Sequence, residues 1–254
     1  NKPICNVPEI SFGSMPNDNG NFLFTNEEKE EFLRKEPGGD KYIKPLISAR
    51  EFLHNEKRWC LWLVEANPSD LKNLPEVTKR IKNVKEYRQS STRDATRKLA
   101  EYPSLFGEIR QPDSDYILIP RVSSENRIYI PIGFFDKTNI VGDTCLSLQD
   151  VTLYHFGILT SSMHMAWTSH VCGRLKSNYR YSNNLVYNNY PWPDSPTLDK
   201  YNRVEEAAKE VLAVRERYMG NNMDEQWVPL ECSRDKATHC IEDTRCSLAE
   251  LYDP

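Results

Sequence analysis

Two apolar segments, 116–122 and 127–132, constrain the fold of this chain more than any other feature. Both are rich in Ile and contain a Tyr, and the polar tetrapeptide 123–126 separates them, which predicts a β-hairpin. Pro120 and Pro131 have no N–H to donate to a neighbouring strand, so we expect a sheet edge or a bulge at each proline. This is the clearest β region of the sequence.

Helical patterns surround this β region. Apolar residues recur at spacings of three and four between positions 74 and 87, so they share one helix face. They are Leu74, Val77, Ile81, Val84 and Tyr87. A second stripe of this kind predicts a regular amphipathic helix over 199–219. Its residues are Tyr201, Val204, Ala208, Val211, Leu212, Arg215 and Tyr218.

Capping residues and short apolar runs predict the remaining elements. Thr25 and Asn26 are good N-caps for a helix over 27–35, and Pro37 with the two glycines after it predicts a turn. Gly173 is expected to cap a long apolar helix, or a helix pair, over 148–173. A further helix is expected over 93–102, and strands are expected over 22–24, 58–64 and 138–148.

These patterns predict an α+β fold, in which a small mixed β-sheet region with flanking helices is followed by a C-terminal helical segment. The polar residues 220–246 are expected to form a loop or a locally disordered insert. No apolar run approaches the roughly 18–20 residues of a membrane span, and there is no signal peptide, so no membrane is expected. Seven scattered cysteines without a Cys-x-x-Cys pair favour a reducing, cytoplasmic compartment. Because it lacks an initiator Met, we expect the chain to be a fragment of a longer protein.

The net charge of −4 is unevenly distributed. Residues 70–193 hold 16 Lys and Arg against 12 Asp and Glu, a balance of +4, whereas residues 1–69 and 194–254 are net acidic. An anionic partner is therefore expected to bind the middle of the chain. The basic face of the helix over 75–87 leaves two interpretations open, an ordinary solvated face or a set of phosphate contacts.

Known catalytic motifs are absent from the sequence. It has no Gly-x-Gly pair for a phosphate loop, no Gly-x-Ser-x-Gly elbow and no His-Glu-x-x-His. Two groups of His and Cys, within 164–172 and within 232–246, lack the paired short spacings of a structural zinc site. We therefore expect no catalytic residue and no metal in this chain, which favours a binding module.

The strongest binding candidate is the polar segment 173–184, which follows the apolar helix. It concentrates cations, hydroxyl groups and Asn amides in one short stretch. Arg and Lys suit the acceptor atoms of guanine, Asn suits adenine, and hydroxyl groups suit phosphates. An ordinary polar loop is the alternative that the composition alone leaves open.

Several long motifs stand out in and around this segment. The longest are FGILTSSMHMAW at 156–167, GRLKSNYRYS at 173–182 and VYNNYPWP at 186–193. Shorter ones are GSMP at 13–16 with Asp18, RWCLWL at 58–63 and SLAELYDP at 247–254. Together these motifs, which span nearly the whole chain, resemble the C-terminal part of the MmeI-like (type IIL) adenine-specific DNA methyltransferases.

The resemblance implies a division of labour within a longer prokaryotic polypeptide of a type II restriction-modification system. Residues 1–193 would be its target recognition domain, and residues 194–254 the truncated start of a C-terminal helical region. The methyltransferase motif Asn-Pro-Pro-Tyr/Phe is missing, so no cofactor is expected in this chain. The parent's own methyltransferase domain would bind S-adenosylmethionine and methylate the exocyclic nitrogen of a flipped adenine. This chain would choose the site on double-stranded DNA.

Three groups of residues are the expected DNA contacts. The first group is Arg174, Lys176, Ser177, Asn178, Tyr179, Arg180 and Ser182, of which Arg174, Lys176, Asn178 and Arg180 are expected nearest the DNA. The second group, in the expected hairpin, is Arg121, Ser123, Ser124, Asn126 and Arg127. The third group, expected to contact phosphates, is Lys79, Arg80, Lys82, Arg93 and Arg97. His164, Trp167 and residues 188–193 are expected to stabilise the fold, because a motif shared by enzymes that read different sites cannot choose the site.

A protein-interaction module is the alternative function. In that case the basic helix and the Tyr-rich segment would bind an acidic protein. DNA binding predicts a steep salt dependence and competition by any duplex, whereas a protein interface predicts indifference to competitor DNA.

Overall fold

The computed structural model describes residues 2–219, and of Tyr218 and Met219 only the backbone. The helices in this range are α1 (Asn26–Lys35), α2 (Ala49–His54), α3 (Pro68–Leu71), α4 (Pro75–Gln89), α5 (Asp94–Lys98), α6 (Leu153–Leu159), α7 (Ser162–Val171) and α8 (Leu198–Met219). Shorter turns are the 3-10 helices η1 (Pro37–Tyr42) and η2 (Leu99–Glu101) and the π-helix η3 (Asn183–Tyr187). The predicted Tyr218 side chain, the insert 220–246 and the motif at 247–254 lie outside the described residues.

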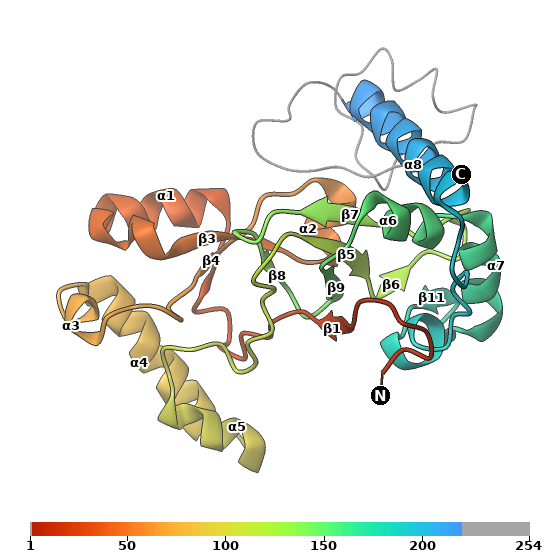
Figure 1. Cartoon of the computed structure of the whole chain (residues 1–254). Coiled ribbons are helices and arrows are strands. Elements are labelled where there is room, and N and C mark those ends of the chain that lie inside the picture. Colours follow the sequence, from red (N-terminus) through yellow and green to blue (C-terminus); the bar gives the residue numbers. More distant parts are fainter. Residues whose placement is uncertain (1, 220–254) are drawn as a thin grey trace.

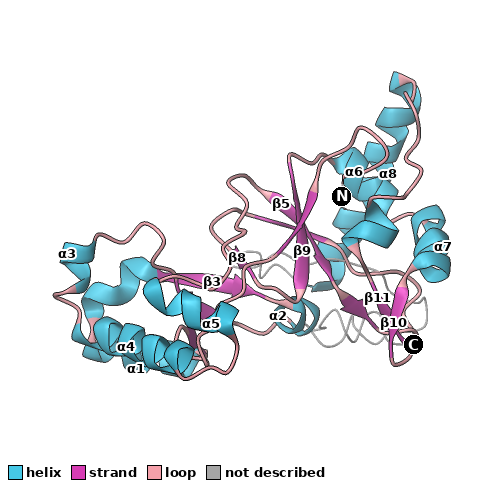
Figure 2. Cartoon of the chain, turned by 90° about the horizontal axis from the view of Figure 1, so that it is seen from below, coloured by secondary structure: helices cyan, strands magenta, loops and turns pink. Residues whose placement is uncertain are grey.

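Three small sheets complete the fold, with the strand orders β2-β4-β3-β8, β1-β9-β5-β7 and β10-β11-β6. The strands are β1 (Ile10–Phe12), β2 (Leu23–Phe24), β3 (Ile43–Ile47), β4 (Trp59–Leu61), β5 (Tyr116–Pro120), β6 (Val122–Ser123), β7 (Gly133–Phe135), β8 (Ile140–Val141), β9 (Cys145–Gln149), β10 (Gly173–Leu175) and β11 (Asn178–Arg180). Figures 1 and 2 show an elongated molecule with α1, α3, α4 and α5 at one end and α6, α7 and α8 at the other. The predicted α+β class is confirmed.

Local capping determines where α1 begins, as predicted. Thr25 Oγ1 accepts from the backbone N–H of Glu28 at 3.2 Å, and the Glu28 carboxylate accepts from the N–H of Thr25 at 2.8 Å. This reciprocal pair is a capping box, which satisfies two N–H groups that the first turn leaves free. At the C-terminal end, η1 begins at Pro37, where a turn is predicted.

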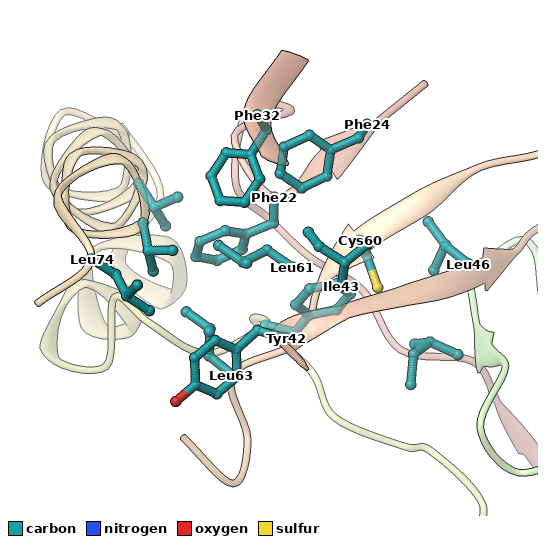
Figure 3. Packing of buried hydrophobic residues seen from close by; sticks show 14 residues of the cluster. Phe22, Phe24, Phe32, Tyr42, Ile43, Leu46, Cys60, Leu61, Leu63 and Leu74 are labelled. Carbon is teal, nitrogen blue, oxygen red and sulfur yellow. The ribbon is translucent and has the colours of Figure 1, made fainter. Parts of the chain in front are cut away.

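The first sheet packs against α1 and α4 to form one apolar core (Figure 3). Phe22, Phe24, Cys60 and Leu61 are fully buried there, and the rings of Phe24 and Phe32 lie 5.1 Å apart. The strand predicted over 58–64 is shorter than expected, but its core position is confirmed.

The buried face of α4 differs from the prediction at its C-terminal end. Val77 and Val84 are fully buried as expected, but Tyr87 is 37% exposed and Arg88 is buried instead. The guanidinium of Arg88 donates to five backbone carbonyls, at distances of 2.7–3.0 Å. They belong to Pro16, Asn17, Leu99, Tyr102 and Leu105. A buried cation is tolerated here because these loop carbonyls need donors.

The predicted hairpin of 116–122 with 127–132 is wrong in its second strand. The first strand is β5, but its partner is β7, with Leu118 opposite Gly133. If this register continued, Pro120 would lie opposite Pro131, and neither residue has an N–H to donate. The ladder between β5 and β7 therefore stops before the prolines, and residues 127–132 form an irregular connection.

Two other predicted elements are divided in the structure. The strand expected over 138–148 is two strands, because the turn at Gly142 sends β8 to the first sheet and β9 to the second. The apolar stretch 148–173 is a helix pair, α6 and α7, with a break at Thr160. Gly173 does not cap α7: Cys172 is the C-cap residue, and Gly173 opens β10.

The second core lies under the C-terminal helices. Gly157 on α6 allows α8 to approach closely, because a Cβ there would lie 2.7 Å from Val204 Cγ1. Ala208 and Arg215 on α8 are 1% exposed, and Arg215 Nη1 donates to the carbonyl of Ile132 at 2.7 Å. The described part of the region predicted to start at 194 thus packs on the preceding residues. The domain boundary itself stays a prediction.

Candidate nucleic-acid interface

The polar segment 173–184 begins with an exposed β-hairpin. Strands β10 and β11 pair antiparallel, with Arg174 opposite Tyr179, and the turn consists of Lys176 and Ser177. The hairpin projects at the end of the molecule that carries α7 (Figures 1 and 2). The ordinary polar loop that the composition left open is therefore a hairpin of two short strands.

Strand β6 joins this hairpin and brings two predicted groups together. Ser123 lies opposite Tyr179 and Val122 opposite Arg180, so residues about 55 positions apart in sequence share a three-stranded sheet. The N–H of Tyr181 donates to the carbonyl of Arg121 at 2.8 Å, which extends the contact by one residue. The first and second groups therefore form one continuous surface.

The register gives the hairpin two different faces. Arg174 and Tyr179 share one face, where the Arg174 guanidinium carbon lies 4.0 Å from the centre of the Tyr179 ring. Arg174 also donates to the carbonyls of Ser177 at 3.1 Å and Ser169 at 3.4 Å. These contacts hold the turn on α7, so Arg174 positions the hairpin.

The other face carries groups that are suited to reading bases. Asn178 and Arg180 lie on it because they are two residues apart on β11. Leu175 is opposite Asn178 and is 50% exposed, and it is an apolar member of this face that the residue-type search missed. Arg180 lies opposite Gly173 on β10 and Val122 on β6, and its side chain is exposed. Cation, amide and methyl groups together match the chemistry of base edges in the major groove.

Lys176, at the tip, has an unusual backbone conformation. Its φ is +56°, in the left-handed region that favours glycine. A residue with a Cβ costs about 1–2 kcal/mol there. Strain of this kind gathers at functional sites, where a side chain is kept for what it binds.

The second group is divided between exposed and buried side chains. Asn126 is exposed, and Arg121 and Ser124 are half-buried. Ser123 and Arg127 are buried, and Arg127 Nη1 lies 3.5 Å from the hydroxyl of Ser123. Ser123 and Arg127 therefore support the connection 121–132 from inside.

The third group lies at the opposite end of the molecule, on α4 and α5 and the residue before α5 (Figure 2). Lys79, Lys82, Arg93 and Arg97 are exposed. Arg80 is not: it donates to the carbonyl of Asn21 and lies 4.1 Å from the Phe24 ring centre, and burial lowers its pKa. Four cations of this group are thus accessible, and Arg80 supports the first core.

A buried aromatic cluster anchors the C-terminal end of the hairpin. The hydroxyl of Tyr181 and Nε2 of His164 form a 3.1 Å hydrogen bond, and both side chains are buried. Burial lowers the pKa of His164 to about 4, so its imidazole is neutral near pH 7. Trp167 Nε1 donates to the carbonyl of Val186 at 2.9 Å. Ser182 caps η3, since its hydroxyl accepts from the N–H of Leu185 at 3.4 Å.

Two cysteines of the described range lie in the apolar cores. Burial raises the pKa of the thiols of Cys60 and Cys145, which keeps these thiols protonated. Within residues 2–219 no three His, Cys, Asp or Glu side chains are grouped so that they could hold a metal ion. No helix of the described range is long and apolar enough to cross a membrane.

The fold and this surface define a class of protein: an α+β domain that presents a cationic hairpin at one end and basic helices at the other. The chain belongs to the family of MmeI target recognition domains, whose model matches residues 1–194. The resemblance that the motifs predict is thereby confirmed.

Two relatives support this assignment. The chain is 42% identical over 219 residues to DNA methyltransferase A of Bacillus subtilis (strain 168), a match that covers 86% of this chain and 25% of that protein. It is also similar to the solved structure of the type IIL restriction-modification enzyme MmeI in complex with DNA, with 41% identity and a TM-score of 0.85. That match covers 100% of this chain and 30% of the MmeI chain. The chain thus spans less than a third of the length of either relative.

Proposed function

We propose that this chain recognises a specific sequence in double-stranded DNA for a larger DNA-modifying enzyme. The observation that carries this proposal is the hairpin 173–180, whose two faces differ. Its reading face carries Leu175, Asn178 and Arg180, and its structural face carries Arg174 and Tyr179. A β-ribbon of this size fits the major groove of B-DNA, where each base pair presents a distinct pattern of donors and acceptors.

The catalytic part of the reaction belongs to another domain in this proposal. The parent would be an S-adenosylmethionine-dependent adenine N6-methyltransferase of a prokaryotic, cytoplasmic restriction-modification system, and its own methyltransferase domain would be the second partner of this chain. No residue of this chain is assigned to S-adenosylmethionine, because the Asn-Pro-Pro-Tyr/Phe motif is absent. The chain's task is to select the adenine that is methylated.

The accessible residues of the three groups make different contacts with the DNA in this proposal. Lys176, Asn178 and Arg180 contact base edges, and Arg174 and Tyr179 hold them in place. Ser124 and Asn126 border the same surface. Phosphate contacts come from Ser177 and from the exposed cations of the third group, which are Lys79, Lys82, Arg93 and Arg97. Phosphate contacts position the domain, and base contacts specify the sequence.

The test is to express the complete protein that carries this chain in a host without adenine methylation and to sequence the DNA for modified adenine. We expect methylation at one short motif. Replacing residues 174–182 by the segment of a relative should change that motif, whereas replacing the exposed turn 136–138 should not. An unchanged motif after the 174–182 exchange would refute the role of the hairpin.

Binding measurements separate this function from the alternative. A DNA-recognition domain loses affinity steeply as salt rises and is competed by any duplex. If the folded protein bound an acidic protein and ignored competitor DNA, the protein-interaction module would replace this proposal.

A further inference from the structure

We infer that Arg110 and Arg121, which both contact the ring of Phe12, form a phosphate-binding site between the two basic ends of the molecule. The inference rests on the proposed DNA-binding function. Arg110 and Phe12 are outside all three predicted groups, and Arg121 is predicted there only as a member of the hairpin.

The site consists of two guanidinium groups around one aromatic ring. Phe12 ends β1, an edge strand of the second sheet. The guanidinium carbons of Arg110 and Arg121 lie 5.6 Å and 4.8 Å from its ring centre. The two guanidinium carbons therefore lie no more than about 10 Å apart, so both groups can contact the same stretch of a bound polyanion.

Backbone contacts hold both arginines in place. Arg121 donates its N–H to the carbonyl of Thr144 at 3.0 Å, and Arg121 Nη1 donates to the carbonyl of Asp143 at 2.8 Å. The N–H of Arg110 donates to the hydroxyl of Ser14, which is fully buried, at 2.9 Å. These bonds fix the backbone of both arginines, which lowers the cost of ordering the site when an anion binds.

A glycine contact packs these segments together. The N–H groups of Gly13 and Ser14 donate to the carbonyls of Cys145 and Val141, at 3.1 Å and 2.7 Å. A Cβ on Gly13 would lie only 2.1 Å from the carbonyl oxygen of Gly142. Only glycine permits this approach, which places the strand with Phe12 directly against the turn that holds Arg121.

Local charge leaves the site positive. Arg110 is paired with Glu108, and its side chain is still 38% exposed. Arg121 has no carboxylate partner among residues 2–219, and only one of its five N–H donors is bound, to the carbonyl of Asp143. The free donors lie in a planar fork, which matches the oxygens of a phosphate.

The position of the site favours the DNA backbone over an acidic protein. The carbonyl of Arg121 accepts from Tyr181 beside the hairpin, and Arg88 on α4 donates to the carbonyl of Pro16 beyond Phe12. Figure 1 shows β1 between α5 and β11. A duplex that reached from the hairpin to α4 and α5 would pass this site, and its phosphates would present a negative charge about every 1.7 Å of its axis.

The test measures the salt dependence of DNA binding by the complete protein. Arg110→Gln and Arg121→Gln are compared with Arg203→Gln, an exposed arginine on α8 that serves as the matched control. Fluorescence anisotropy follows a duplex with the methylated motif and a duplex with that motif scrambled, over a series of KCl concentrations. Thermal unfolding checks that each variant folds.

We expect each site variant to weaken binding to both duplexes equally, by about three- to tenfold, and to reduce the salt slope by about 0.9. Arg203→Gln should change neither value. Arg110→Lys and Arg121→Lys keep the charge but lose the planar fork, so they should keep the slope and still weaken binding to both duplexes; that weakening is the readout if a glutamine variant does not fold, and unchanged affinity would then overturn the site.

The outcomes distinguish this inference from the proposed function. If the unaltered protein bound neither duplex, the proposed function would fail. If it bound DNA and the slope stayed unchanged in both glutamine variants, only the phosphate site would be overturned. A loss confined to the duplex with the motif would also overturn it, because the two arginines would then read bases.

Discussion

Replacing Lys176 by glycine should make the protein more stable and at the same time a weaker DNA binder. Lys176 has a φ of +56°, and glycine removes about 1–2 kcal/mol of strain at such a position. The greater backbone entropy of glycine in the unfolded chain returns about 0.5–1 kcal/mol. The net gain is therefore between about 0 and 1.5 kcal/mol, and each kcal/mol raises Tm by about 2–4 °C in a protein of this size.

The DNA-binding part of the same prediction follows from the lost cation. If Lys176 contacts a base edge, its removal costs about 1–3 kcal/mol, a loss of roughly 5–150-fold in affinity. Differential scanning calorimetry gives Tm, and fluorescence anisotropy with a duplex that contains the recognised motif gives Kd. Lys176→Gln is the matched control, since it removes the charge but keeps the strained backbone: affinity should fall without a gain in Tm. A glycine variant with lower Tm and unchanged Kd would refute the reasoning.

Other predictions test the reading face and its support. Arg180→Ala should cost about 1–3 kcal/mol on the specific duplex and relax preference at one base pair, as read from the methylated motif; equal losses on all sequences would contradict it. Arg88→Met should lower the free energy of unfolding by at least about 3 kcal/mol in urea titrations, because five carbonyls lose a charged donor. His164 has a folded pKa of about 4 and an ordinary pKa of 6.5, so the unfolded state binds more protons between these values. Stability should therefore fall by up to about 3 kcal/mol as pH drops from about 6.5 to 4, and His164→Gln should remove that part of the pH dependence.

Elements defined by local signals could be predicted from the sequence. The capping box of Thr25 and Glu28 sets the start of α1, and the apolar spacing of Val77 and Val84 sets the inner face of α4. At Tyr87 and Arg88 the local signal predicts the wrong buried residue. Periodicity favours Tyr87 as the buried residue, but the loop carbonyls around α4 need donors, and Arg88 supplies them.

Elements that depend on pairing between distant residues could not be predicted. Strand β6 has two residues, and it becomes a strand only because β11 lies beside it. The arrest of the β5–β7 ladder likewise depends on two prolines that meet only in one register. The site could likewise be predicted only in part. The residue types of segment 174–182 indicate DNA binding, but its division into a reading face and a structural face depends on the register of β10 and β11.

This division explains how one fold could serve many DNA sequences. Arg174, Tyr179 and Tyr181 hold the hairpin through contacts with α7, the turn carbonyl and the buried His164. The side chains of Lys176 and Arg180, in contrast, are exposed and make no hydrogen bond or ion pair within residues 2–219. Substitutions at the exposed positions therefore cost little folding free energy and can change base contacts freely, whereas substitutions at the anchors would move the whole reading face. A specificity change by exchange of side chains on the reading face is thus compatible with an unchanged scaffold.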